Sequence, residues 1–228
     1  MKNICIIPAR GGSKRIPRKN IKEFLGKPII AYSIEAALKS GLFDEVMVST
    51  DDEEIAAIAK QYGAKVPFLR SAETANDYAT TADVLLEVLA KYREQGQEFD
   101  NLCCLYATAP FVKAERLREC FDLMQDEIDS AFTVVEYSYP IQRSLVKDGQ
   151  RIRMAYPEHK NSRSQDLEKH YHDAGQFYFS TVKNLEENKF LWGAHTAPLV
   201  LSELEVQDLD TMTDWKLAEI KFRLINEN

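Results

Sequence analysis

The residues best suited to chemistry stand together near the start of the chain. Gly11, Gly12 and Ser13 follow directly after a short apolar run at residues 4–7. Two glycines behind a strand let the backbone turn tightly and leave its N–H groups free to face a ligand. The same loop carries five cations: Arg10, Lys14, Arg15, Arg18 and Lys19. Cations beside such amides favour a phosphate pocket, and the alternative is a solvated basic loop.

This loop differs from two common nucleotide-binding motifs. It contains neither the G-x-G-x-x-G of dinucleotide-binding proteins nor the G-K-[ST] of a P-loop. Its density of cations suits a triphosphate that loses pyrophosphate, because negative charge builds up on the leaving group. We expect Arg10 and Lys19 to stabilise that charge, and Arg15 and Arg18 remain open as solvated side chains.

A second set of candidate residues lies near the other end of the chain. Asp208 and Asp210 are two residues apart, so in an extended segment both carboxylates face the same side. Such a pair fits Mg²⁺, which combines one or two protein carboxylates with phosphate oxygens and water. The alternative is that Asp210 caps the last helix and Asp208 is a surface residue. His170 and His172 lack a third ligand in register and fit carboxylate recognition equally well.

Composition excludes several classes of protein. The 228 residues carry a net charge of −7, so one basic segment does not make a general nucleic-acid binder. No apolar stretch approaches the roughly 20 residues of a membrane span, and Arg10 interrupts any signal region. Four cysteines match no zinc spacing and are expected to be reduced core residues of a cytoplasmic protein: Cys5, Cys103, Cys104 and Cys120.

Strand and helix patterns alternate along the first part of the chain. Short apolar runs predict strands at residues 4–7, 46–48, 65–69, 102–106 and 130–135. Helical spacing predicts helices between Pro28 and Gly41, after Asp52, through 84–92 and over about 114–124. This order predicts an α/β domain with a mostly parallel sheet and helices on both faces. The loops at Gly11, Asp51 and Pro110 would then share the ligand-binding edge.

The alternation fails between Tyr137 and Asp173. This segment is polar and contains Pro140 and Pro157. We expect an excursion from the single domain 1–228, either a dimerisation arm or a lid, with β structure of its own. The chain then re-enters the core at residues 175–179, and the end of the chain is predicted to form a strand at 198–201, a turn at 208–210 and a helix at 211–225.

The glycine-rich basic motif near the start of the chain resembles a known family signature. Residues 6–14 (IIPARGGSK) and 17–20 (PRKN) closely resemble the signature of the CMP-sialic acid synthetase family of cytidylyltransferases. The resemblance continues in order through nearly the whole chain, at STD (49–51), RSAE (70–73), DYATT (77–81), TAP (108–110), GQFY (175–178) and DLDT (208–211). It implies a Rossmann-like nucleotidyltransferase domain, a dimerisation arm and a homodimer. The implied reaction joins CTP to a 2-keto sugar acid and releases pyrophosphate.

The resemblance also implies roles for individual residues. Arg10 and Lys19 would hold the triphosphate, with Lys14 beside them. Asp208 and Asp210 would bind Mg²⁺ and complete the catalytic set. The nucleotide would be held by the loop residues Gly11, Gly12 and Ser13, and its cytidine and ribose by Ala9, Asn20, Arg70, Ala79 and Thr81.

Two departures from the family pattern fall where the sugar is expected. Tyr106 replaces a glutamine of the sialic acid synthetases, and residues 172–175 read HDAG where Arg-Pro-Asn-Gly stands. This combination resembles the members that activate pseudaminic acid, a nonulosonic acid with an acylamino C7 and a deoxy C9. A tyrosine presents an apolar face that suits a less hydroxylated side chain. The expected sugar-binding residues are Tyr106, Arg143, Arg163, His172, Gln176 and Tyr178.

Arg143 and Arg163 are expected to include the partner of the sugar carboxylate, since arginine binds a carboxylate through two bonds. One of them would come from a second subunit if the arm reaches across a dimer. Other substrates left open are neuraminic, legionaminic and 3-deoxy-octulosonic acids. The alternatives from other classes are a nucleotide sensor without turnover and a dinucleotide-dependent oxidoreductase, which the missing fingerprint disfavours.

Overall fold

The computed structural model describes residues 1–226 and confirms the α/β class with a mostly parallel sheet. The described residues form a six-stranded central sheet of order β10-β6-β9-β5-β1-β4. Strand β9 runs antiparallel to both of its neighbours, whereas the other pairs of the sheet are parallel. The strands are β1 (Asn3–Pro8), β4 (Glu45–Ser49), β5 (Asn101–Leu105), β6 (Ser130–Glu136), β9 (Tyr171–Thr181) and β10 (Thr196–Leu201).

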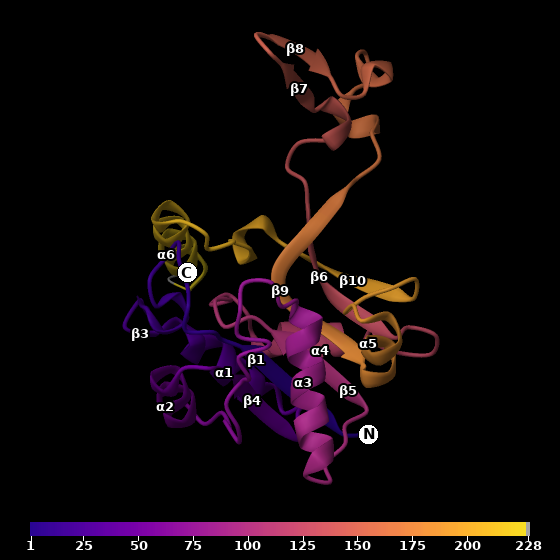
Figure 1. Cartoon of the computed structure of the whole chain (residues 1–228). Coiled ribbons are helices and arrows are strands. Elements are labelled where there is room, and N and C mark those ends of the chain that lie inside the picture. The colour runs from indigo at the N-terminus through magenta and orange to yellow at the C-terminus, as the bar shows by residue number, and fades with distance from the viewer. Residues whose placement is uncertain (227–228) are drawn as a thin grey trace.

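Helices cover both faces of this sheet (Figure 1). Helices α1, α2 and α4 pack on one face, and α3 and α5 pack on the other. The helices are α1 (Ile29–Ser40), α2 (Glu53–Gln61), α3 (Thr81–Glu94), α4 (Ala114–Phe121), α5 (Val182–Asn188) and α6 (Met212–Asn226). Short 3-10 turns are η1 (Lys19–Ile21), η2 (Ile141–Arg143), η3 (Pro157–His159), η4 (Ser164–Asp166) and η5 (Glu203–Glu205), and a small ribbon pairs β2 (Glu23–Phe24) with β3 (Lys27–Pro28).

The predicted helix ends follow local backbone chemistry. Gly41 ends α1 with φ +68°, a conformation that glycine adopts without the strain of a Cβ. Asp52 begins α2 by accepting the Ile55 amide proton at 3.0 Å, as an N-cap aspartate does. Both predictions are confirmed. Helix α4 ends at Phe121, three residues earlier than predicted.

The predicted strand at residues 65–69 is wrong. Lys65 alone forms a bridge, to Met47 of β4. Pro67 has no N–H to donate, so the pairing with β4 does not continue along the chain. The other predicted strands and the last helix are present, and their ends differ from the predicted ends by no more than two residues. The re-entrant strand is the exception, because it is longer than predicted and spans Tyr171–Thr181.

The four cysteines are buried free thiols, which confirms their predicted place in the core. Burial raises the pKa of Cys104 and Cys120, the latter to about 12, so neither thiol is a ready nucleophile. Among residues 1–226, none of the helices combines the length and hydropathy that a membrane span requires.

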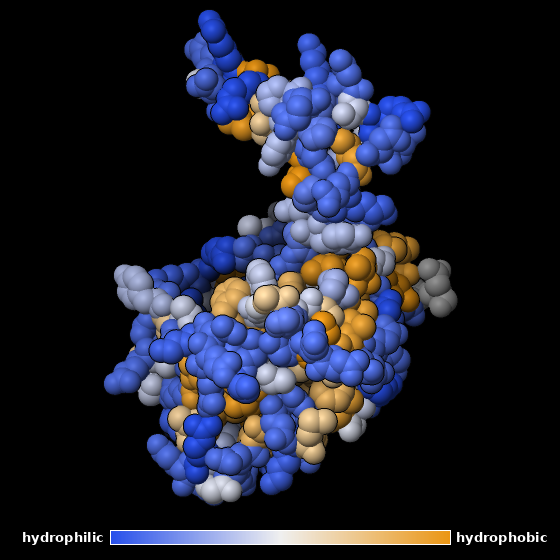
Figure 2. Space-filling view, turned by 90° about the vertical axis from the view of Figure 1, so that its right-hand side faces the viewer, coloured by the Kyte–Doolittle hydropathy of each residue, from blue (hydrophilic) through white to orange (hydrophobic). Residues whose placement is uncertain are grey.

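Residues 137–170 form an arm that stands away from the body (Figure 1). Strands β7 (Leu145–Asp148) and β8 (Arg151–Met154) pair there as an antiparallel hairpin. Figure 2 shows a mostly hydrophilic arm with scattered apolar patches, and the exposed apolar side chains include Leu145 and Ile152. The predicted excursion therefore has β structure of its own, and the chain returns from it to the central sheet along β9.

A separate apolar cluster anchors the last helix. Trp215 of α6 is 2% exposed and meets the edge of the Phe24 ring at a centroid distance of 5.6 Å. Leu209, 1% exposed, packs in the same cluster just before α6 begins. This cluster fixes the segment that carries Asp208 and Asp210.

Replacing Trp215 by alanine should lower the free energy of unfolding by about 3–5 kcal/mol, because a large buried ring would leave a cavity. Ile220→Ala is the matched control, since Ile220 lies on the same helix and is 63% exposed. It should change the stability by less than about 0.5 kcal/mol. Urea unfolding of both variants checks this, and equal losses would contradict the assignment of the core face of α6.

Candidate active site

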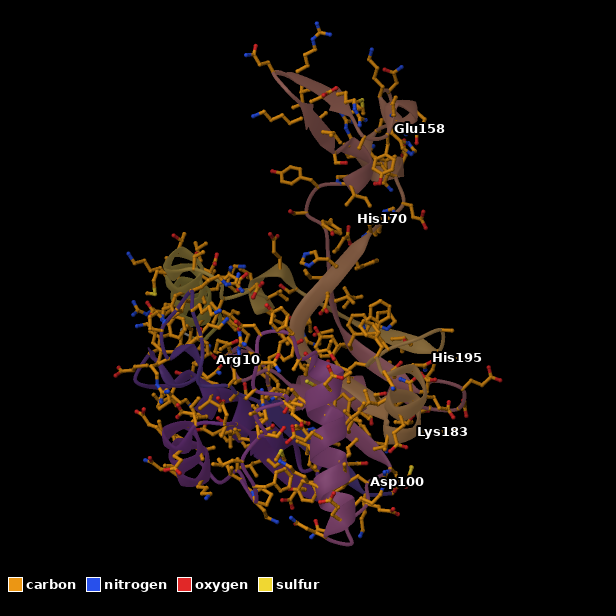
Figure 3. All side chains as sticks on the ribbon, in the orientation of Figure 1. Arg10, Asp100, Glu158, His170, Lys183 and His195 are labelled. Carbon is orange, nitrogen blue, oxygen red and sulfur yellow. The ribbon has the colours of Figure 1, made fainter. Side chains whose placement is uncertain are left out.

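A cavity of about 510 Å³ opens at the carboxyl ends of β1 and β5. Pro8 at the end of β1 and Tyr106 after β5 both line it. Ligands of parallel sheets bind at this edge. The cavity brings together most of the predicted nucleotide-binding residues: Arg10, Ser13, Lys14, Lys19, Asn20, Arg70, Ala79 and Thr81. Arg10 lies in the middle of the body in Figure 3.

One amide of the glycine loop is engaged within the protein. The Gly11 amide donates to Asp51 Oδ1 at 2.9 Å, and the buried Ala9 amide donates to Ser49 O at 2.9 Å. A Cβ on Gly11 would lie 2.8 Å from Asp52 Oδ2, so glycine lets the loop approach Asp52 without displacing its side chain. Ala9, Gly11 and Gly12 lie outside the cavity lining. The side-chain cations, rather than the Gly11 amide, face the cavity.

One carboxylate bridges two of these cations. Asp77 accepts from Arg10 at 2.6 Å and from Lys14 at 2.5 Å. The hydrogen bonds from Lys14 and Arg10 lower the pKa of Asp77, which therefore stays ionised. Asp77 thus occupies the position between two cations where a phosphate group would bind. The DYATT motif contained Asp77, but its spacing did not indicate this contact.

Two further cations of the loop are engaged in ion pairs. Arg18 lies at φ +55° and pairs with Asp52 and Glu54. The Arg18 hydrogen bond lowers the pKa of Asp52 to about 2. Arg15 pairs with Asp210 at 2.5 Å. Arg18 is held by two carboxylates outside the cavity lining, so it is not simply solvated. Arg15 lines the cavity with a side chain that is 68% exposed, and for this residue the alternative remains a prediction.

Lys19 connects the loop to the aspartate segment. Its Nζ donates to Leu209 O at 2.8 Å, the carbonyl between Asp208 and Asp210. Burial lowers the pKa of Lys19, and the nearby carboxylates of Asp210 and Asp208 offset part of this effect. The predicted triphosphate cation and the predicted metal ligands are therefore neighbours, although 190 residues separate Lys19 from Leu209.

The two aspartates are free of the helix-capping role considered above. At the start of α6, Asp214 Oδ2 accepts the Thr211 amide proton at 2.6 Å and Thr211 Oγ1 accepts that of Asp214 at 3.3 Å. Asp208 is exposed and Asp210 is half-buried. Within residues 1–226, no group of three or more His, Cys, Asp or Glu side chains forms a metal site. The donors present fit a hard cation that takes its other ligands from phosphate and water.

Arg70 and Asn20 are partly engaged with the backbone around the cavity. Arg70 Nη2 donates to Ser49 O at 2.6 Å, and burial lowers the pKa of its guanidinium. Asn20 Nδ2 donates to Arg10 O at 2.9 Å. Both side chains line the cavity and at the same time hold the ends of β4 and β1 in place.

A smaller cavity of about 220 Å³ adjoins the first one, since Tyr106 and Thr81 line both. Its other walls are mostly apolar, and Phe190 and Trp192 are 52% and 41% exposed there. Tyr178 lines it too, donating to Asp173 Oδ2 at 2.6 Å. Asp173 belongs to the HDAG turn that the sequence analysis placed near the sugar. Phe190 and Trp192 were not identified there, because aromatic residues in a connecting segment give no periodic signal.

His172 lines a third cavity, of about 370 Å³, together with Asp173 and Asp208. Its ring lies 4.9 Å from that of Tyr137, centroid to centroid. Gln176 is 4% exposed and donates to Glu205 O, so it faces neither cavity. The structure places His172 beside the metal-ligand candidate and Gln176 in the interior.

The predicted sugar-binding arginines lie on the arm. Arg143 donates to Ser162 O at 3.0 Å, and Arg163 pairs with Asp166 at 2.7 Å. Both pairs are local to the arm, whose base is marked by His170 in Figure 3. Within one chain the structure does not bring either arginine to these cavities.

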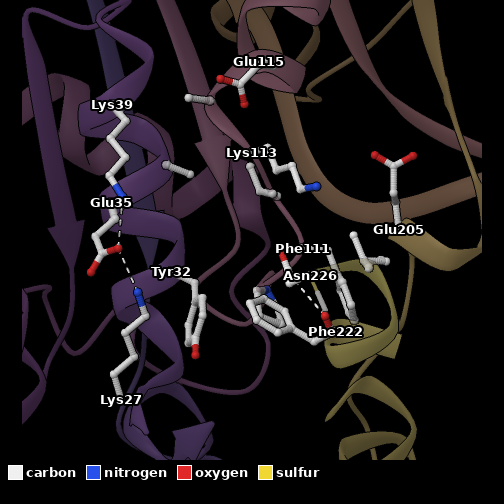
Figure 4. Close-up of a pocket in the computed structure, with 15 residues that line it drawn as sticks. Lys27, Tyr32, Glu35, Lys39, Phe111, Lys113, Glu115, Glu205, Phe222 and Asn226 are labelled. Atoms are coloured by element: carbon white, nitrogen blue, oxygen red, sulfur yellow. Dashed lines mark hydrogen bonds and ion pairs between the residues drawn. The ribbon is translucent and has the colours of Figure 1, made fainter. Parts of the chain in front are cut away.

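A further cavity of about 350 Å³ separates α1 from α6 (Figure 4). Lys27 and Lys39 both pair with Glu35 on its α1 side, at 2.8 and 3.5 Å. Phe111 and Phe222 form an apolar wall opposite. None of the predicted site residues lines this cavity, so we place the candidate chemistry at the sheet edge instead.

Comparisons with known proteins identify the family of the chain. A family model described as cytidylyltransferase matches residues 4–183. The chain is 47% identical to the pseudaminic acid cytidylyltransferase of Campylobacter jejuni over 230 residues, covering 100% of this chain and 99% of that protein. It is 36% identical to the CMP-N,N'-diacetyllegionaminic acid synthase of Legionella pneumophila over 236 residues, covering 100% and 99%.

A solved CMP:2-keto-3-deoxy-manno-octonic acid synthetase, in complex with CTP, has the same fold. The TM-score is 0.70 at 21% identity, with 100% of both chains covered. The family that the first motif predicted is thus confirmed over most of the sequence. The chain belongs to the cytidylyltransferase family.

Proposed function

We propose that this protein couples CTP to pseudaminic acid and releases pyrophosphate. The observation that carries the proposal is the meeting of a cation-lined cavity with a carboxylate pair, through the bond from Lys19 to Leu209 O. The full-length identity of 47% to a pseudaminic acid cytidylyltransferase supports the choice of sugar.

The cavity residues fit a triphosphate at the sheet edge. Arg10, Lys14 and Lys19 bring three cations toward the β- and γ-phosphates, with Arg10 and Lys14 released from Asp77 when the anion enters. The sugar's C2 hydroxyl oxygen attacks the α-phosphorus in line and gives up its proton to solvent, and the bond from that phosphorus to the bridging oxygen breaks. Arg10 and Lys19 stabilise the pyrophosphate that leaves with the bond's electron pair.

Asp208 and Asp210 are the proposed holders of a divalent cation, which we take to be Mg²⁺. When bound, it supplies charge neutralisation on the phosphate oxygens. Arg15, which pairs with Asp210 at 2.5 Å, then shares that carboxylate or turns to the phosphates. Asp208 lines the cavity beside His172, and Lys19 binds the next carbonyl along the chain, so Asp208 is proposed to face the sugar as well as the nucleotide.

The sugar side is proposed from the two smaller cavities. Tyr106 and Tyr178 offer rings 5.5 Å apart, and Phe190 and Trp192 extend this apolar wall. An acylamino methyl group fits such a wall better than a hydroxylated chain does. Asp173 is the polar residue beside it and accepts the Tyr178 hydroxyl proton.

The carboxylate of the sugar is assigned to Arg143 or Arg163 of a second subunit. Both lie on the arm, and the arm exposes Leu145 by 57% and Ile152 by 66%. Exposed apolar side chains on a projecting hairpin favour burial against another copy. We therefore propose a homodimer in the cytoplasm, with each arm completing the other subunit's sugar site.

Legionaminic acid is the second candidate sugar, because the 36% identity to the legionaminic acid synthase also extends over the full chain. Measuring pyrophosphate release with CTP over a panel of nonulosonic acids distinguishes pseudaminic acid from legionaminic acid as the substrate. We expect the highest kcat/KM with pseudaminic acid and little release with UTP. Comparable rates with UTP, or a preference for neuraminic acid, would overturn the assignment.

Asp208→Asn should reduce kcat by roughly 10²–10⁴-fold, since it removes a carboxylate from the proposed metal site. The Kd for CTP in the presence of EDTA should stay within about twofold of the unmodified protein. Glu219→Gln, which removes one charge from α6, is the control and should leave kcat unchanged. A nucleotide sensor without turnover would instead show no CTP- and sugar-dependent pyrophosphate release in any of these proteins.

Asp77→Asn should tighten the binding of pyrophosphate and CTP by about three- to tenfold. The carboxylate competes with phosphate for Arg10 and Lys14, and exposed ion pairs of this kind are individually weak. Glu73→Gln is the matched control, because Glu73 lies in the same exposed loop and its carboxylate makes no hydrogen bond or ion pair within residues 1–226. Isothermal titration calorimetry measures the Kd of pyrophosphate and of CTP for both variants. Weaker binding by Asp77→Asn would mean that Asp77 organises the cations instead.

A further inference from the structure

The segment that carries Asp208 and Asp210 has no strand or long helix to hold it. It runs from Ser202 to Thr211, between β10 and α6, and includes only the short turn η5. We call residues 202–211 the strap. Backbone carbonyls outside regular structure need other partners. The strap's partners come from α6, which follows it, and from three elements distant in sequence, η1, α4 and β9.

Side-chain donors bind the strap carbonyls one after another. Lys221 of α6 donates to Glu203 O at 3.2 Å and to Val206 O at 2.8 Å. Gln176 of β9 donates to Glu205 O at 2.5 Å. Lys19 of η1 donates to Leu209 O, as described above. The strap is therefore fixed by the surrounding domain along most of its length.

Glu205 is the most strongly held point of the strap. Arg116 of α4 reaches Oε1 with Nε at 2.9 Å and Oε2 with Nη2 at 3.1 Å, a two-bond pair. Oε2 also accepts the Ser202 amide proton at 3.2 Å. The Glu205 side chain is only 14% exposed. Burial alone would raise its pKa, but the Arg116 and Ser202 bonds outweigh burial and lower it.

Gln176 connects this point to the nucleotide cavity. Its own carbonyl accepts the amide proton of Tyr106, which lines that cavity, at 2.9 Å. Its side chain, 4% exposed, faces the strap. A single residue thus links the cavity wall after β5 with the segment that bears the two carboxylates. This contact differs from the sugar-binding role expected for Gln176.

We infer that Arg116 and Gln176 are positioning residues of the reaction, which clamp Glu205 and so hold Asp208 and Asp210 over the phosphate loop. The inference rests on the proposed function of those two aspartates. Neither clamp residue lines the nucleotide cavity or the cavity beside His172. They keep the two carboxylates in a fixed position beside Lys19. Without the clamp, the strap could shift relative to Lys19.

The test uses Arg116→Gln and Gln176→Met in the full-length protein. Gln176→Met keeps the volume and removes the donor, and Arg116→Gln removes the two-bond pair. Arg118→Gln is the matched control, because Arg118 lies on the same helix and pairs with Glu115, away from the strap. Thermal unfolding of each variant shows that the folded protein is being compared.

Two readouts separate positioning from general stability. The first is Mn²⁺ affinity at saturating CTP, followed by electron paramagnetic resonance, with Asp208→Asn as the baseline for loss of the site. The second is hydrogen exchange of the strap amides, which needs no metal. We expect five- to tenfold weaker Mn²⁺ binding, faster exchange at residues 206–211 and a KM for CTP within twofold in both clamp variants. Arg118→Gln should match the unmodified protein.

The outcomes distinguish the inference from the function on which it rests. Folded clamp variants with unmodified Mn²⁺ affinity and strap exchange would overturn the positioning role. If Asp208→Asn binds Mn²⁺ as the unmodified protein does, the metal assignment fails, and strap exchange alone then decides whether the clamp exists. The double variant Arg116→Gln with Glu205→Gln should be no worse than the single one, since Arg116 acts through Glu205. An additive loss would contradict this.

Discussion

The candidate site depends on the contact between two loops that leave parallel strands at the same edge. Because β1 and β4 run side by side, the acids that follow β4 reach the glycine loop that follows β1. Asp51 takes the Gly11 amide, and Asp52 takes the Arg18 guanidinium. A side chain at position 11 would require the Asp52 carboxylate to move away from its bond with Arg18, since a Cβ would approach that carboxylate to 2.8 Å. The loop is therefore shaped by acids from its neighbour, and its remaining cations are free to face the cavity.

Strong local signals made much of the fold predictable. The Gly41 end of α1 and the Asp52 start of α2 follow from the backbone needs of one or two residues. Strand direction is different, because an apolar run reads the same in either direction. Nothing local showed that β9 would run antiparallel between β5 and β6. Residues 65–69 carried a strand-like pattern, but Pro67 and a lack of further partners prevented a ladder.

The site was predictable in its residue types and not in its pairings. The cations of the first loop and the Asp208–Asp210 pair were identified by motif and spacing, and the structure brings Lys19 to the carbonyl between the two aspartates. The contact of Asp77 with Arg10 joins residues 67 apart, and no periodicity encodes such a distance. Gln176 shows the same limit. It was expected at the sugar, whereas its side chain is buried against the strap.

The position of β9 also determines the order in which parts of the sheet can form during folding. Strands β5 and β6 do not pair with each other, because β9 lies between them. The β5-β1-β4 part of the sheet and the β6 part stay separate until residues 171–181 have been synthesised and have paired between β5 and β6 as strand β9. Pairings between distant segments form slowly, since loop closure comes first. Completion of the sheet, and with it the seating of Tyr178 and Gln176, is therefore a late step of folding on the ribosome.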